Sequence, residues 1–184
     1  MKKYTQADFD AFEVIDGIKQ CPSGDYSDIQ IFGAWCSFGE RCSFGKWCSF
    51  GEWCSFGKCC SFGKQCSFGE CCSFGRGCSF GRARSFGRAC SFGAWCSFGE
   101  GCSFGRACSF GECCAFGECC AFGEGCSFGK CCFFGEGCSF GEGCSFEDKG
   151  EYIGDYPFMA FVGFGSRIGS KVYFFNLQDG IYVR

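Results

Sequence analysis

Cysteine offers the widest choice of chemistry in this chain, which has 24 cysteines among 184 residues. Thiols can bind soft metal ions, form disulfides or undergo redox reactions. Most of the cysteines recur at every sixth residue from Cys36 to Cys144, and Arg84 stands where one is expected. Five more directly precede members of that series: Cys59, Cys71, Cys113, Cys119 and Cys131. Zinc sites favour two cysteines separated by two residues, and this spacing is absent, so metal, disulfide and redox roles stay open beside a structural one.

Basic and aromatic residues form a second set of candidates. Arg76, Arg82 and Arg88 follow one another at six-residue intervals and could hold a phosphate, a nucleotide or an acidic partner. A tryptophan set occupies variable positions near the start of the same pattern and could anchor a contact with another protein: Trp35, Trp47 and Trp53. The simpler interpretation is that the charges keep the surface soluble and the tryptophans cover their neighbours. The net charge of -3 indicates no uniformly charged surface.

All these residues belong to a six-residue repeat, Phe-Gly-x-x-Cys-Ser, with Phe at every sixth position from Phe32 to Phe146. Cys-Ser-Phe alternates apolar, polar and apolar residues, which is the pattern of a short strand with Cys and Phe on one face. We expect Gly-x-x to turn the chain, because glycine adopts backbone angles that other residues resist. Glycine at this frequency also excludes a helix. The repeat therefore predicts a solenoid with a core of phenylalanine rings and thiols.

The repeat resembles that of the hexapeptide left-handed parallel β-helix family, with Phe in place of Ile, Leu or Val. The resemblance covers about residues 26 to 146 and implies a triangular coil of about 18 residues, in which residues one coil apart stack. Cys113 would then share a column with Cys131 on the adjacent coil. The three arginines would form a collar around one coil.

Arg84 would enter the core of such a coil, in a column otherwise made of cysteines. A buried guanidinium without a partner is very costly. We expect Arg84 to bend outward, open a local bulge or find an acidic partner.

The enzymes of the hexapeptide family that this repeat resembles depend on histidine. Acyltransferases of the hexapeptide family use a histidine base, and related carbonic anhydrases bind zinc through histidines. The chain contains no histidine, so neither site can be carried over. The same absence removes Ser-His and Cys-His nucleophilic pairs. We therefore expect no enzymatic activity and no cofactor.

The chain divides into three parts around the repeat. Residues 1–31 are expected to form an N-terminal cap, with a capping box at Thr5 and Asp8 and a hairpin turn at Asp16-Gly17. Residues 32–146 form the hexapeptide β-helix, and residues 147–184 form a C-terminal antiparallel β meander that caps the other end. The whole chain also resembles Ser-Phe-Gly repeat proteins of gut bacteria and phages, which share the "YFFN" and "DGI" motifs near the end. That resemblance implies no activity.

Partners and location follow from what the chain lacks. The opening "MKKYTQADFDAF" has no apolar signal-peptide segment and no run is long enough to cross a membrane, so we expect no membrane association and a cytoplasmic protein with free thiols. Aromatic rings that point inward cannot stack on bases, so nucleic acid is not an expected partner.

We predict a non-enzymatic, rigid scaffold that binds a protein partner or associates with itself. Two alternatives remain. One is a soft-metal or redox protein that uses Cys113, Cys131 and Cys119. The other is a phage-type decoy that sequesters a nucleotide or blocks a host factor at the arginine collar.

Overall fold

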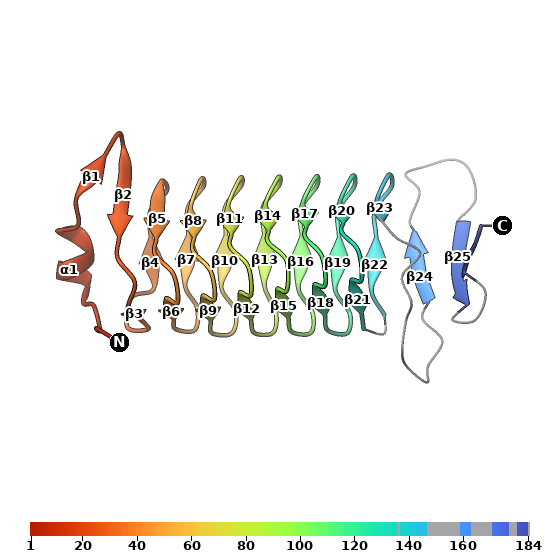
Figure 1. The fold of residues 1–184 in the computed structure, drawn as a ribbon, viewed down its shortest axis with the longest axis horizontal. Helices are drawn as coiled ribbons and strands as arrows, with labels where there is room; N and C mark the ends of the chain where they lie inside the picture. Colours follow the sequence, from red (N-terminus) through yellow and green to blue (C-terminus); the bar gives the residue numbers. More distant parts are fainter. Residues whose placement is uncertain (136, 147–158, 163–170, 177–179, 184) are drawn as a thin grey trace.

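A computed structural model describes residues 1–135, 137–146, 159–162, 171–176 and 180–183. Figure 1 shows short strands that lie side by side in successive coils along one axis, with a helix and a hairpin at the N-terminal end. The helix, α1 (Gln6–Asp10), has five residues, and the other regular elements of the described residues are strands. None of the described residues lies in a helix long and apolar enough to cross a bilayer. The predicted all-β parallel solenoid is confirmed.

Three sheets form the faces of the triangular coil. Sheet 1 contains, in spatial order, β1 (Val14–Ile15), β2 (Ile18–Cys21), β5 (Cys36–Phe38), β8 (Ser55–Phe56), β11 (Ser73–Phe74), β14 (Ser91–Phe92), β17 (Ser109–Phe110), β20 (Ser127–Phe128) and β23 (Ser145–Phe146). Sheet 2 contains β4 (Ile31–Phe32), β7 (Ser49–Phe50), β10 (Ser67–Phe68), β13 (Ser85–Phe86), β16 (Ser103–Phe104), β19 (Ala121–Phe122), β22 (Ser139–Phe140), β24 (Met159–Val162), β25 (Lys171–Asn176) and β26 (Gly180–Val183). Sheet 3 contains β3 (Asp25–Tyr26), β6 (Ser43–Phe44), β9 (Ser61–Phe62), β12 (Ser79–Phe80), β15 (Ser97–Phe98), β18 (Ala115–Phe116) and β21 (Phe133–Phe134).

The register of these sheets fixes the length of the coil. Strand β11 pairs with β14 in parallel, and Ser73 lies opposite Ser91. The same offset of 18 residues relates Ser49 to Ser67 in β7 and β10. One coil therefore contains three hexapeptides, as the repeat predicted. The handedness of the coil stays a prediction.

Phenylalanine rings fill the interior, and those from Phe32 to Phe128 are at most 5% exposed. Within a coil the rings meet edge to face, as in Phe92 and Phe98, whose centroids are 5.1 Å apart at 86°. Between coils they stack, as in Phe92 and Phe110 at 4.9 Å and 4°. Both arrangements suit the charge distribution of aromatic rings and contribute about 0.5–1.5 kcal/mol per pair beyond the burial of area. The phenylalanines therefore form continuous stacks of rings along the axis.

The repeated glycine allows close packing of successive coils. A Cβ on Gly105 would lie 2.7 Å from the carbonyl carbon of Gly87 and 2.8 Å from the nitrogen of Arg88, both in the preceding coil. Unusual backbone angles occur two residues after the glycine, where φ is 55° at Ala107 and 54° at Ala89. The prediction that the repeated glycine supplies these angles was wrong. Glycine is needed at its position because a Cβ there would collide with the backbone of the preceding coil.

The N-terminal segment covers the open end of the first coil. Thr5 Oγ1 accepts a hydrogen bond from the Asp8 backbone nitrogen at 3.2 Å, and the Thr5 nitrogen donates to Asp8 Oδ2 at 2.8 Å, which confirms the capping box. Helix α1 then places the buried Phe9 ring edge-on against Phe32, with centroids 5.2 Å apart. Phe32, the first phenylalanine of the repeat, is therefore shielded from water.

A hairpin and a meander extend two of the sheets. Strands β1 and β2 pair in an antiparallel hairpin across Asp16 and Gly17, whose φ values are 50° and 80°, as predicted. At the other end β24 continues sheet 2 in parallel with β22, and β25 and β26 follow in antiparallel pairing, which is the predicted meander. Residues 147–158 and the predicted turn at Asp179 lie outside the described residues.

Candidate functional site

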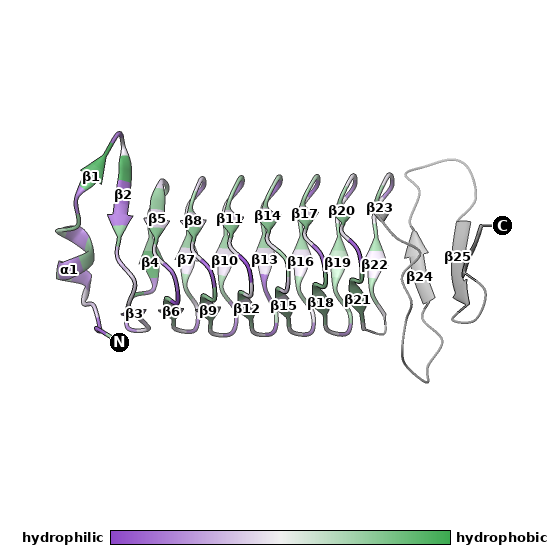
Figure 2. Cartoon of the chain, viewed as in Figure 1, coloured by the Kyte–Doolittle hydropathy of each residue, from purple (hydrophilic) through white to green (hydrophobic). Residues whose placement is uncertain are grey.

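The solenoid corners are the part of the coil that varies in sequence, and Figure 2 shows that hydrophilic residues recur along these connecting segments. The second variable residue of each Gly-x-x corner has a positive φ. Residues 18 positions apart lie above one another on successive coils, so these residues form three lines parallel to the axis, which we call ridges. The tryptophan ridge contains Trp35, Trp53, Cys71, Ala89, Ala107, Gly125 and Gly143. The cysteine ridge contains Arg41, Cys59, Gly77, Trp95, Cys113 and Cys131. The third ridge contains Trp47, Gln65, Ala83, Gly101, Cys119 and Gly137.

Two of the predicted tryptophans lie together on the tryptophan ridge. The rings of Trp35 and Trp53 stack with centroids 5.4 Å apart and planes at 8°, and the residues are 48% and 50% exposed. Strand β2 lies at the start of this ridge, because Lys19 pairs with Cys36 and its nitrogen donates to the Trp35 carbonyl at 2.8 Å. Trp47 lies on the third ridge and is 60% exposed. The structure therefore joins Trp35 and Trp53 in one surface and leaves Trp47 on another corner.

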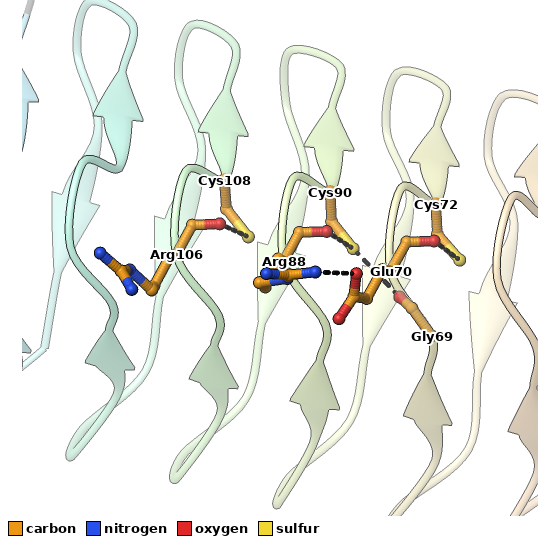
Figure 3. Close-up of polar contacts among 7 residues, drawn as sticks. All are labelled: Gly69, Glu70, Cys72, Arg88, Cys90, Arg106 and Cys108. Atoms are coloured by element: carbon orange, nitrogen blue, oxygen red, sulfur yellow. Dashed lines mark hydrogen bonds and ion pairs between the residues drawn. The ribbon is translucent and has the colours of Figure 1, made fainter.

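The predicted arginine collar occupies the first variable position of three successive corners. Arg88 Nη2 lies 2.8 Å from Glu70 Oε2 in the preceding coil (Figure 3). Arg82 forms an ion pair with Glu100 in the following coil. Arg76 has no ion pair within the part of the chain that the structure describes. Each of the three arginines precedes a strand of a different sheet, so their guanidinium groups are distributed around the coil.

These acidic partners were missed at the sequence level although a signal was present. Glu70 and Glu100 lie one coil away from the arginines that they contact. Writing the sequence in rows of 18 residues would have placed each acid above or below its base. The arginine side chains are 60% and 66% exposed in these pairs, so solvent screens the charges and the pairs contribute little to stability.

The regularly spaced core thiols have a hydrogen-bonding role. Cys90 Sγ donates to the Gly69 carbonyl of the preceding coil at 3.4 Å (Figure 3). The contact recurs between Cys108 and Gly87, also at 3.4 Å. A thiol is small, apolar and a weak donor. It therefore suits a small apolar slot and adds a contact that alanine could not make.

Arg84 remains in the core, where it is 2% exposed. Its Nη2 donates to the Phe62 carbonyl at 2.8 Å and its Nε to the Gly81 carbonyl at 3.4 Å. Within the described residues Nη1 has no hydrogen-bond partner. The predictions of an outward bend, a bulge or an acidic partner were wrong, because β13 keeps its register with both neighbours and so fixes the inward direction of residue 84.

The burial of Arg84 has local consequences for spacing and charge. The Ser85 nitrogen lies 3.4 Å from the Cys66 carbonyl, whereas the equivalent bond from Ser91 to Cys72 is 2.9 Å. Burial lowers the pKa of the Arg84 guanidinium, and the nearby Cys66 opposes this effect. The hydrogen bond with the Cys48 thiol and the charge of Arg84 lower the pKa of Cys66 to about 6. Arg84 and Cys66 therefore influence each other's protonation inside the core.

Among the predicted metal ligands, only two lie together. Cys113 and Cys131 are neighbours on the cysteine ridge, and the Cys113 nitrogen donates to the Lys130 carbonyl at 2.8 Å. Cys119 lies on the third ridge, between Gly101 and Gly137. The described residues contain no group of three or more His, Cys, Asp or Glu side chains that could hold a metal ion.

Comparisons with protein-family models, curated proteins and solved structures gave no match to this chain. The functional argument therefore depends on the surface of the solenoid itself.

Proposed function

We propose that this β-solenoid is a rigid, non-enzymatic scaffold that binds a protein partner, or a second copy of itself, through the tryptophan ridge. The observation that carries the proposal is the stacked pair of Trp35 and Trp53, each about half exposed. Large aromatic residues left on a surface are the residues that dominate protein contacts. The pair is already ordered by stacking, so binding would cost little side-chain entropy.

The hairpin at the same end of the solenoid also exposes apolar residues. Val14 and Ile15 are 57% and 48% exposed on β1. Exposed apolar residues near the stacked tryptophans support a partner contact at this end of the solenoid.

Three further parts of the proposal rest on the sequence. The lack of histidine supports a role without catalysis. The many free thiols support a reducing cytoplasm. The resemblance to Ser-Phe-Gly repeat proteins supports an origin in a gut bacterium or one of its phages.

The test compares three baits in affinity capture from a lysate of the source cells: the wild type, the double variant Trp35→Ala/Trp53→Ala, and Trp95→Ala as a matched control. Alanine occupies the same backbone conformation at Ala89 and Ala107, so the changes should preserve the corner. Trp95 is 60% exposed but belongs to another ridge. Circular dichroism checks the fold of each bait.

We expect the wild type and Trp95→Ala to capture a partner that the double variant does not capture. Sedimentation velocity applies the same comparison to self-association. Identical captured proteins and identical sedimentation for all three chains would refute the role of the tryptophan ridge.

A further inference from the structure

Two surface thiols lie directly above one another on the cysteine ridge. Cys113 and Cys131 each stand two residues before a strand, and these strands, β18 and β21, pair in parallel with Ala115 opposite Phe133. Both cysteines have φ of 56°. Their Cα–Cβ bonds therefore leave the backbone in the same direction, one coil apart.

The distance between these coils is defined by the core beneath them. The rings of Phe116 and Phe134, each three residues after one of the cysteines, lie 5.0 Å apart with planes at 5°. This translation carries one corner onto the next, so two thiols in the same rotamer have sulfur atoms about 5 Å apart, close to the usual strand spacing.

This arrangement distinguishes the pair from the other corner cysteines. Along its own ridge each of the others has neighbours without a thiol: Cys59 lies between Arg41 and Gly77, Cys71 between Trp53 and Ala89, and Cys119 between Gly101 and Gly137. Cys131 is exposed and Cys113 is partly exposed, whereas most of the regularly spaced core thiols are buried.

The separation of the two sulfurs favours a metal ion held in line between them over a disulfide or a zinc site. A disulfide needs Cβ atoms about 3.5–4.5 Å apart and sulfurs about 2.05 Å apart, which parallel side chains on successive coils do not provide. Zinc needs four ligands. Two metal–sulfur bonds of about 2.3 Å placed in line span about 4.6 Å, which matches the coil spacing.

We propose that Cys113 and Cys131 form a two-coordinate site for a soft monovalent cation of the Cu(I) class, with the ion between two successive coils. Thiolates select such ions, and linear coordination needs no third ligand from the chain. On binding, each thiol releases one proton to solvent and forms one sulfur–copper bond, so that Cu(I) and two thiols give a bis-thiolate with one negative charge and two protons. No electron is transferred.

The charges around the site influence this equilibrium. Lys130 directly precedes Cys131 and opposes the negative charge of the bis-thiolate, whereas Glu112 directly precedes Cys113 and adds to it. Partial burial, together with Cys131 and Glu112, raises the pKa of the Cys113 thiol. Protons therefore compete with the ion, and binding should strengthen as the pH rises.

The test uses the full, reduced chain under anaerobic conditions, titrated with Cu(I) in competition with a coloured Cu(I) chelator. We expect one ion per chain retained against the chelator in the wild type. Cys113→Ser and Cys131→Ser should each weaken retention by about 100-fold or more, because the second thiol acts at an effective concentration in the millimolar range. Cys119→Ser is the matched control and should retain the ion.

X-ray absorption of the loaded chain provides a readout that does not depend on variants. Two sulfur neighbours in line support the site. Three sulfur ligands, equal retention by all the variants, or loss of the ion from Cys119→Ser as well would overturn it.

Discussion

Replacing Arg84 by cysteine should stabilise the solenoid, because it removes a buried cation and restores the column of thiols. The side chain is 2% exposed and Nη1 has no partner within the described residues. In Arg84→Cys the new thiol would lie beside the Gly63 carbonyl, as Cys102 lies 3.6 Å from the Gly81 carbonyl. The bond from Ser85 to Cys66 could then shorten from 3.4 Å toward the usual 2.9 Å.

The expected gain in the free energy of unfolding follows from two costs of burying Arg84. An unsatisfied buried donor costs about 1–3 kcal/mol. Exchanging a buried ionic group for an apolar one that fits is worth about 1–4 kcal/mol. These costs overlap, so we expect an increase of about 2–3 kcal/mol in the free energy of unfolding.

The assay is guanidinium unfolding in reducing buffer at pH 6, followed by circular dichroism, with midpoints compared at equal slopes. Cys108→Arg supplies the converse, since it places a second guanidinium at a position that is 0% exposed and should lower the midpoint. A lower midpoint for Arg84→Cys than for the wild type would refute the reasoning, because it would show that the buried cation makes a net favourable contribution.

Further predictions concern pH and glycine. The pKa of Cys66 lies near 6 in the folded chain, because of its hydrogen bond with Cys48 and the charge of Arg84, and near 8.5 when unfolded. The unfolded chain therefore binds the extra proton, so the contribution of Cys66 to stability is present above about pH 8.5 and is lost as the pH falls through about 6. Denaturation at a series of pH values should show this loss, and the loss should be weaker in Arg84→Cys. Gly105→Ala should destabilise by at least about 2 kcal/mol, because its Cβ would meet the preceding coil. In the same unfolding assay Gly125→Ala, which has open space and φ of 66°, should cost about 1 kcal/mol, and equal losses would contradict the packing role of the repeated glycine.

The architecture could be predicted because each hexapeptide carries the same pattern. Alternation in Cys-Ser-Phe fixes which side chains point inward, and a constant period fixes which residues stack. The pairing of Ser73 with Ser91 and the adjacency of Cys113 and Cys131 follow from these two facts. Charged pairs between coils, such as Arg88 with Glu70, were equally accessible but depend on comparing columns rather than neighbours.

Other features depend on atomic distances that the pattern does not contain. The hydrogen bond from Cys90 to the Gly69 carbonyl depends on the spacing of two coils, and so does the clash that excludes a Cβ from Gly105. Arg84 shows a further limit. Its residue type predicts an exposed side chain, but Ser85 and Phe86 are held on both sides by neighbouring strands, and the backbone determines the direction. A long side chain can then reach carbonyl oxygens inside the core.

The translation that relates one coil to the next has a genetic consequence. Recombination between misaligned repeats that adds or removes three hexapeptides would leave each remaining ring and thiol with the same kinds of neighbour, so the rod could lengthen or shorten without a new fold. Gain or loss of a single hexapeptide would rotate everything downstream by one face of the triangle. The gene can therefore gain or lose the codons for whole coils, and the two ends of the encoded rod keep the same relative orientation.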